Sequence, residues 1–232
     1  ERQAYLLLMA IILLWGANWP IMKYGLQFIS PLWFASIRLL LGSLCLFALI
    51  SARKEFSMPN TRDLPILISV GFLQLGLGLA FIHFGLTVVD AGRSAILAYT
   101  TPLWVTPLAV IALKEKISMT KGCGLCIGII GIAVLFNPNE FNFTNIKGLI
   151  GNGYLILSAM LLAIVIIHVR YHKMKMRPLQ LMPWQMLIGG KILAICAIYW
   201  EGTPDIEFTL PITVILAYNG IIASAFCFWA YQ

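Results

Sequence analysis

The stretch Ala95-Ile-Leu-Ala-Tyr-Thr-Thr-Pro-Leu-Trp104, followed by Leu113-Lys-Glu-Lys-Ile-Ser118, decides the fold class. Two long apolar segments meet here at a short charged elbow, and the first contains Pro102 and Pro107. A proline inside a helix removes a backbone hydrogen bond, so we expect a kink. In lipid, the freed carbonyl must be satisfied by protein or by a water-filled cavity. The pattern predicts a broken helix beside a pathway through a membrane protein.

The composition favours a membrane protein over a soluble one. Of 232 residues, 60% are hydrophobic and 11% are charged, against about 25% charged residues in soluble domains. The net charge of +7 does not predict nucleic-acid binding, because the basic residues fall in short clusters between apolar segments. The five cysteines lie in apolar segments, so no disulfide framework is expected. No cofactor or metal site is predicted, and the expected partners are the lipid bilayer and a small-molecule substrate.

Eight apolar stretches have the length of membrane-spanning helices. Each is near the ~20 residues that cross about 30 Å of hydrocarbon. The expected spans are residues 4–26, 31–51, 64–86, 92–113, 119–137, 147–169, 179–200 and 210–232. The sequence therefore predicts an all-α membrane protein, a multi-span helical bundle.

The loops between these spans alternate in charge. Most of the 16 basic residues fall at the N-terminus or after the second, fourth and sixth spans: Arg2, Arg53, Lys54, Arg62, Lys114, Lys116, Lys121, Arg170, Lys173, Lys175 and Arg177. The other side holds Lys23, Arg93 and Lys147 with most of the acidic residues. Basic loops remain in the cytoplasm, so the N-terminus is predicted to be cytoplasmic.

A weak internal repeat relates the two halves of the chain. Pro31-Leu32 matches Pro178-Leu179, and the same offset of 147 residues pairs Arg38 with Gln185 and Leu41-Gly42 with Ile188-Gly189. Gly71 to Gly76 matches Gly220 to Ala225 at an offset of 149. One repeat then has five spans, and an odd number inverts the second copy. We expect a first repeat over 1–137 and a second over 138–232, truncated after its third helix, from a protein of ten helices.

The first half resembles an EamA domain of the drug/metabolite transporter superfamily. The matching residues are Trp15-Gly16, Pro31, Arg38, Ala95, Thr101-Pro102-Leu103, Lys114-Glu115-Lys116, Gly122, Gly128 and Gly131; Gly148, Ala159 to Ala163 and Gly220 to Trp229 resemble a second such domain. The resemblance implies two inverted five-helix halves and alternating-access transport of a small metabolite. It also implies a central cavity, built chiefly from the first, third, fourth, sixth, eighth and ninth helices.

Polar and aromatic side chains within the spans are the candidates for substrate binding. They are Trp15, Asn18, Trp19, Gln74, Tyr99, Thr100, Thr101, Trp104, Tyr154, Ser158, Asn219 and Trp229. The group around Pro102 is the strongest signal, although its threonines could instead cap the freed carbonyls. Asn18 could equally hold two helices together by a hydrogen bond, and Trp19 could belong to an interfacial aromatic belt.

Two residues within spans have a possible charge or proton role. Arg38 lies at a depth where a charge costs roughly 2.5–3.5 kcal/mol, so it must face protein or water. It either binds a substrate carboxylate or has a structural role. His83 either carries a proton or makes an interfacial hydrogen bond. Nine residues separate Gln74 from His83, so the two face opposite sides of a regular helix.

These patterns predict a secondary transporter in a bacterial inner membrane, carrying a small polar metabolite such as an amino acid by alternating access. A nucleotide-sugar or drug carrier is the alternative within transport. An intramembrane lipid-modifying enzyme would need clustered acids, bases or metal ligands, which the spans do not show, so no enzyme is expected. No acidic residue lies mid-span, which argues against proton-for-cation exchange. Substrate, direction, coupling ion and oligomeric state stay open.

Overall fold

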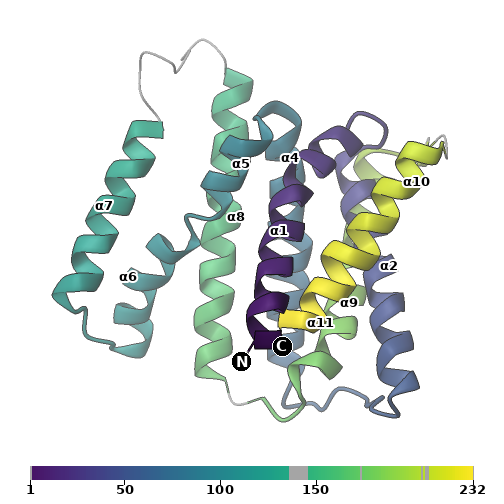
Figure 1. The fold of residues 1–232 in the computed structure, drawn as a ribbon, viewed down its shortest axis with the longest axis horizontal. Coiled ribbons are helices and arrows are strands. Elements are labelled where there is room, and N and C mark those ends of the chain that lie inside the picture. Colours follow the sequence, from purple (N-terminus) through teal and green to yellow (C-terminus); the bar gives the residue numbers. More distant parts are fainter. Residues whose placement is uncertain (1, 136–145, 173, 205, 207–208, 232) are drawn as a thin grey trace.

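A computed structural model describes residues 2–135, 146–172, 174–204, 206 and 209–231. Within these residues the chain is all α-helical, with no strand. Seven helical stretches are long and apolar enough to cross a membrane, and an eighth, Met119–Val134, is apolar but shorter. The predicted multi-span helical bundle is confirmed (Figure 1).

The predicted spans agree with the observed helices to within a few residues, although three of them are subdivided. The elements are α1 (Arg2–Gly25), α2 (Pro31–Ala52), α3 (Leu64–Ile68), η1 (Ser69–Gly78), α4 (Leu79–Val88), α5 (Ala91–Ala98), α6 (Thr101–Leu113), α7 (Met119–Leu135), α8 (Ile146–Tyr171), α9 (Pro178–Trp200), α10 (Leu210–Ala217), η2 (Tyr218–Phe226) and α11 (Cys227–Tyr231). The third span is α3–η1–α4, the fourth is α5–α6, and the eighth is α10–η2–α11.

The segments η1 and η2 are π-helical, a feature that the apolar pattern did not predict. A π-helical turn has an i→i+5 hydrogen-bond pattern and is frequent at functional sites. Their first residues, Ser69 and Tyr218, are separated by the offset of 149 residues that relates the third and eighth spans in the sequence. The same local departure from α-helix therefore occurs at matching places in the two halves.

The fourth span is broken just before Pro102. Helix α5 ends at Ala98, and Pro102 lies in the first turn of α6, where its missing N–H leaves no hydrogen bond unmade. The charged elbow is also present, since α6 ends at Leu113 and Lys114 adopts a left-handed conformation with φ of 55°. The elbow turns the chain into α7.

Helices α2 and α9 cross the centre of the bundle and are joined by reciprocal hydrogen bonds. Ser36 Oγ donates to Gly190 O at 2.9 Å, and Ser43 Oγ donates to Pro183 O at 2.8 Å. Ser36 and Pro183 are 147 residues apart, and so are Ser43 and Gly190. The two bonds therefore join equivalent positions, with donor and acceptor helix exchanged. The same relation connects two bonds at the helix ends, from Trp33 Nε1 to Gly202 O and from Gln180 Nε2 to Glu55 O, both 2.9 Å.

Glycines occupy equivalent positions in the two halves, at the places where α2 meets η2 and where α9 meets η1. A Cβ added at Gly42 of α2 would lie 3.1 Å from Gly220 O, and one at Gly189 of α9 would lie 2.9 Å from Gly71 O. These contacts are too short for a larger side chain without a shift of the backbone. Glycine therefore allows α2 to approach η2, and α9 to approach η1, in the same way.

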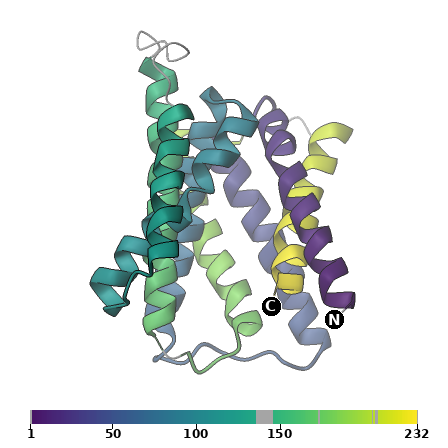
Figure 2. The ribbon, with the colours of Figure 1, turned by 60° about the vertical axis from the view of Figure 1, so that its left-hand side comes forward.

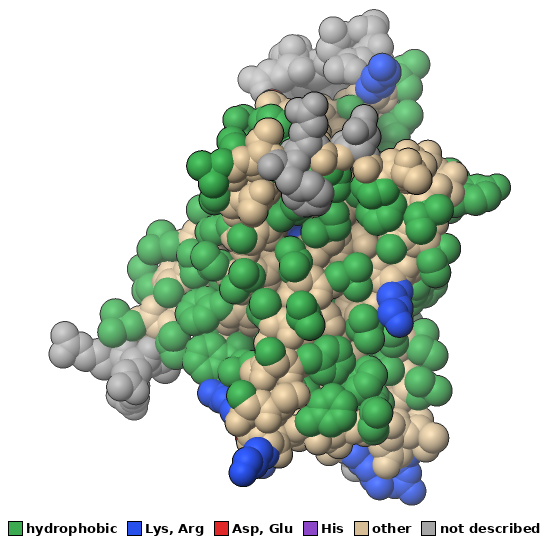
Figure 3. Space-filling model, turned by 90° about the vertical axis from the view of Figure 1, so that its right-hand side faces the viewer, with side chains coloured by type: hydrophobic (Ala, Val, Ile, Leu, Met, Phe, Trp, Pro, Cys, Tyr) green, Lys and Arg blue, Asp and Glu red, His purple; other side chains and the backbone are tan. Residues whose placement is uncertain are grey.

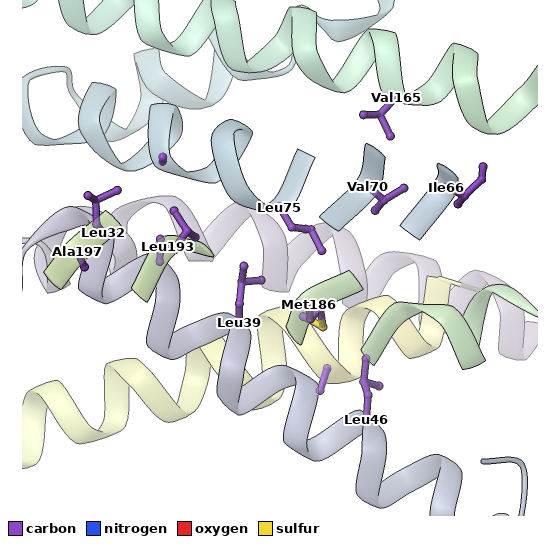
Figure 4. Packing of buried hydrophobic residues seen from close by; sticks show 13 residues of the cluster. Leu32, Leu39, Leu46, Ile66, Val70, Leu75, Val165, Met186, Leu193 and Ala197 are labelled. Carbon is purple, nitrogen blue, oxygen red and sulfur yellow. The ribbon is translucent and has the colours of Figure 1, made fainter. Parts of the chain in front are cut away.

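The helices of the two halves run in opposite directions. In Figure 1, α1 and α3–η1–α4 rise from the lower end while α2 descends; α8 and α10–η2–α11 descend while α9 rises. Their shared core lies around α2, α9 and η1, where Leu39 and Leu46 surround Met186 (Figure 4). Figure 2 shows α1 beside α11 at the lower end.

The lower end is also where the basic connections gather. The α2–α3 and α8–α9 connections and the α6–α7 elbow all lie there (Figures 1 and 2). On the face drawn in Figure 3, apolar side chains cover most of the height; Lys and Arg side chains lie near the lower edge, with others at the top and half way up the right side. The grouping of basic loops that the sequence predicts is thus present in space.

Candidate functional site

A cavity of about 500 Å³, here called the main cavity, lies between helices of both halves. Its wall includes Trp15 from α1, Gln74 from η1 and Leu162 from α8. Met174 and Pro178, from the α8–α9 connection and the start of α9, also line it. The main cavity therefore extends from the basic, lower end of the bundle towards its middle.

The walls of the main cavity are predominantly apolar. Branched and aromatic side chains dominate, among them Val165, Met182 and Phe228. The polar groups are few, with Gln74 and Gln185 in the middle of their helices and Arg170 near the lower end of α8. Small-molecule sites typically combine an apolar wall with a small number of placed polar groups. The arrangement suits a small solute better than a bare ion.

A smaller inner cavity of about 110 Å³ adjoins the main cavity. The two share Gln74, Leu75, Leu162 and Phe228 as wall residues. The polar side chains that line the inner cavity are Arg38, Gln74, Ser158 and Ser224. The inner cavity is thus the deeper end of one site, and Arg38 is the charged side chain in its wall.

Arg38 is the charged group of this site and is only 6% exposed. Its Nη2 donates to Ser224 Oγ at 3.3 Å, and its Nη1 lies 2.8 Å from the thioether sulfur of Met22. Its Nε has no hydrogen-bond partner within the described residues. The guanidinium is therefore desolvated, with only weak acceptors around it.

The upper end of the bundle is closed by side-chain contacts. Trp19 Nε1 donates to the Tyr99 hydroxyl at 3.3 Å, and the two rings meet edge to face. Lys23 Nζ donates to Leu86 O at 2.7 Å and also to Val89 O, which joins the upper part of α1 to the end of α4. The site is accessible from the lower end and covered at the upper end.

Four of the residues singled out from the sequence meet at these cavities. Trp15 and Gln74 line the main cavity, while Arg38 and Ser158 line the inner one. The apolar wall was missed, because an apolar residue facing a cavity cannot be distinguished from a lipid-facing one by type alone. Gln185 was also missed as a site residue, although its position as the repeat counterpart of Arg38 was a signal that could have identified it.

The predicted cluster around Pro102 lies outside both cavities. The Thr100 and Thr101 hydroxyls donate to Leu97 O and Ala98 O at the α5–α6 break, and Leu97 O also accepts the Thr100 backbone N–H. Trp104 Nε1 donates to Thr100 Oγ1, and Tyr99 is 58% exposed. The threonines therefore do what the alternative interpretation expected, and the cluster's role in substrate binding stays a prediction.

Of the other predicted site residues, Asn18 and Asn219 are buried among helices, and Tyr154 and Trp229 are half-buried. Asn18 and Asn219 each have an Oδ1 atom that lacks a partner within the described residues. Tyr154 stacks on Phe81 with ring centroids 5.6 Å apart, and Trp229 lies under the guanidinium of Arg53.

His83 is fully buried and packs edge to face against Phe34. Its Nδ1 is 2.8 Å from Leu79 O. It does not line either cavity, whereas Gln74 lines both, so the two side chains face different surroundings as the helical spacing predicts. The proton role of His83 is untested.

The chain is similar in sequence to proteins of a known transporter family. Residues 2–137 match the EamA-like transporter family. The chain is 26% identical to the uncharacterized transporter YoaV of Bacillus subtilis, covering 95% of this chain and 75% of that protein. It is 28% identical to the WAT1-related protein At3g02690, chloroplastic, of Arabidopsis thaliana, covering 94% of this chain and 54% of that protein.

A solved crystal structure has the same fold. It superposes with a TM-score of 0.71 at 17% identity, over 100% of this chain and 78% of the other. The family match and the names of the relatives point to a transporter rather than an enzyme. Within the described residues, no group of three or more His, Cys, Asp or Glu could hold a metal ion. The chain belongs to the EamA-like transporter family.

Proposed function

We propose that the chain is a secondary transporter that carries a small polar metabolite, such as an amino acid or related compound, across a bacterial inner membrane by alternating access. The observation that carries the proposal is the continuous site between the two halves. It extends from the basic end to Arg38 and Gln74 in the middle of the bundle, and it is covered by Trp19 and Tyr99 at the other end.

We further propose that residues 1–137 and 138–232 are two inverted EamA repeats, the second incomplete. The reciprocal bonds of Ser36 and Ser43 across the α2–α9 pair support this division, as do the matching π-helical segments. Transporters built from inverted repeats move one half against the other around a site at their interface. In such a movement the main cavity closes below while the Trp19–Tyr99 contact opens above.

The lower, basic end is proposed to face the cytoplasm, with the N-terminus there. Cysteines at Asn60 in the α2–α3 connection and at Thr203 after α9 test this orientation, since both positions are exposed. An impermeant thiol reagent applied to intact cells should label only the second. Labelling of Asn60→Cys alone would reverse the orientation.

Filling the main cavity tests the transport site. Leu162 lines both cavities, and Ile164 of the same helix is 45% exposed on the outside of the bundle. Leu162→Trp should abolish solute flux in proteoliposomes, because the indole occupies the path, and Ile164→Trp should retain it. Normal flux through a well-folded Leu162→Trp variant would rule out this cavity as the path.

A nucleotide-sugar or drug carrier is the second candidate within transport. A nucleotide sugar has two negative charges on one diphosphate, whereas the two guanidiniums of the site line different cavities, Arg38 the inner one and Arg170 the lower end of the main one. A small metabolite therefore fits the site better. Screening metabolites, nucleotide sugars and cationic drugs by thermal stabilisation of the purified protein separates these classes.

A further inference from the structure

We propose that Arg38 binds the carboxylate of a small organic acid whose apolar body lies in the main cavity. The proposal rests on the transport function proposed above, because it names the chemical class of solute for that same site. It assigns the inner cavity to the anionic head and the main cavity to the apolar tail. The transported species would then be an amphipathic monocarboxylate.

Arg38 has no charge partner among the described residues. Among the described residues the ion pairs are Arg170–Glu115 and Arg177–Glu55, both near the lower end. Arg38 has no carboxylate within reach there, although it is buried in the middle of α2. A buried charge normally has a partner, because its desolvation costs several kcal/mol. An anion that binds beside such an arginine therefore offsets part of this desolvation cost.

The three nitrogens of the Arg38 guanidinium have weak hydrogen-bond partners or none. Nε has no partner, and the present partners of Nη1 and Nη2 are a thioether and a hydroxyl at 3.3 Å. Guanidinium groups bind carboxylates through two parallel N–H donors. Nε is buried as well as unpaired, so a carboxylate reaches this edge of Arg38 after a small shift of the side chain, which breaks no strong existing bond. The hydroxyls of Ser158 and Ser224, which line the same cavity, add neutral donors.

The two cavities place a small space beside the Arg38 guanidinium next to a larger, mainly apolar space. The inner cavity has a volume of about 110 Å³. Among the described residues that line it, Arg38 is the one with a charged side chain. The main cavity of about 500 Å³ continues from it past Leu162 and Phe228 into an apolar space. A carboxylate with a hydrocarbon or aromatic body matches this order of surfaces. A cationic solute would meet an uncompensated like charge.

The test compares phenylacetate with phenylacetamide, which has the same body but no charge. Binding to the detergent-purified protein is measured by thermal stabilisation and by titration calorimetry. Phenylacetate should bind and the amide should bind much more weakly. Arg38→Gln should weaken phenylacetate binding at least about thirtyfold, because it removes one member of a desolvated charge pair. Arg53→Gln, at an exposed arginine, is the matched control and should bind normally.

Equal binding of acid and amide would overturn the proposal, and so would stabilisation by chloride alone. If Arg38→Gln does not fold, Ser158→Leu gives a second route, since it fills the inner cavity and leaves the charge. It should abolish the preference for acid over amide. A preserved preference in that variant would contradict the assignment. Failure of the transport function itself is recognised separately, as binding of the acid without flux in proteoliposomes.

Discussion

The α2–α9 pair and the α6–α7 pair are similar in apolar composition but packed in different ways. Between α2 and α9, serine hydroxyls bond to carbonyls across the interface, and Gly42 and Gly189 each lie within van der Waals reach of a backbone carbonyl. Helix α7 stands at the edge of the bundle beside α6 (Figure 1). Most of its side chains are exposed, among them Ile127, Ile130 and Val134.

The difference teaches what holds this bundle together. In lipid, apolar side chains gain little by leaving the hydrocarbon for a helix interface, so association depends on close packing and on interhelical hydrogen bonds. The α2–α9 pair has both. The α6–α7 contact includes one close approach, at Gly128 against Leu103, while Gly124 and Gly131 meet nothing within 4 Å. Small residues therefore indicate packing only where a partner helix lies against them.

The largest expected effect is a valine at Gly189. Its Cβ would lie 2.9 Å from both Gly71 O and Leu75 Cβ, so α9 and η1 must separate. Overpacking of this kind typically costs about 1–3 kcal/mol, and more where backbone must shift. The free energy of unfolding, measured by titration with SDS in mixed micelles, should fall by at least that amount. Gly124→Val in α7 is the control and should change it by less than about 0.5 kcal/mol.

Equal destabilisation by the two valines would remove the contrast between the regions. A stable Gly189→Val protein with an unchanged far-UV CD spectrum would likewise show that the close approach of α9 to η1 is not required.

A smaller effect is expected at Glu201, which follows α9 and holds the start of α2. Its carboxylate accepts hydrogen bonds from Ser30 Oγ, Leu32 N and Trp33 N at 2.6, 2.9 and 3.1 Å. Glu201→Gln should cost about 1–3 kcal/mol, because an amide cannot accept all three bonds. Glu115→Gln at the elbow should cost under about 1 kcal/mol, because its contact with Arg170 is 3.9 Å long and exposed. The same titration compares them, and a reversed order would contradict this account of the helix end.

The smallest effects are expected for the two serines of the α2–α9 interface. Ser36→Ala and Ser43→Ala should each lower the free energy of unfolding by roughly 0.6 kcal/mol, the average for hydrogen bonds between membrane helices. Their hydrogen bonds are related by the offset of 147 residues, so the two losses should be similar. Ser51→Ala, at the exposed end of α2, should cause no measurable loss. Losses that differ by more than about 1.4 kcal/mol, a tenfold difference in the equilibrium constant of unfolding, would argue against equivalent environments.

Most of the fold was predictable from the sequence, because span length and apolarity are fixed by the thickness of the bilayer. The break at Pro102 and the elbow at Lys114 were predictable for the same kind of reason, since proline and charge act locally. The π-helical segments were not predictable. They contain Gly71 and Gly220, which lie against the opposite half, and that contact is not encoded in the pattern of one helix.

The candidate site was less predictable than the fold. Polarity within a span identified Arg38, Gln74 and Ser158, but it equally selected Thr100 and Thr101, whose hydroxyls satisfy their own helix break. The sequence shows that a buried polar group needs a hydrogen-bond partner, but it does not identify that partner. The apolar wall, represented by Leu162, required the packing of five spans to be known.

The most direct test of the central claim is the accessibility of Gln74 from the two sides of the membrane. Gln74 lines both cavities. In a variant with its five cysteines replaced by alanine, Gln74→Cys is treated with a small impermeant thiosulfonate in sealed right-side-out and inside-out vesicles, with Asn60→Cys and Thr203→Cys marking the sides. Alternating access predicts labelling of Gln74→Cys from both sides, each slowed by a bound solute. Labelling from one side only, with or without solute, would contradict it.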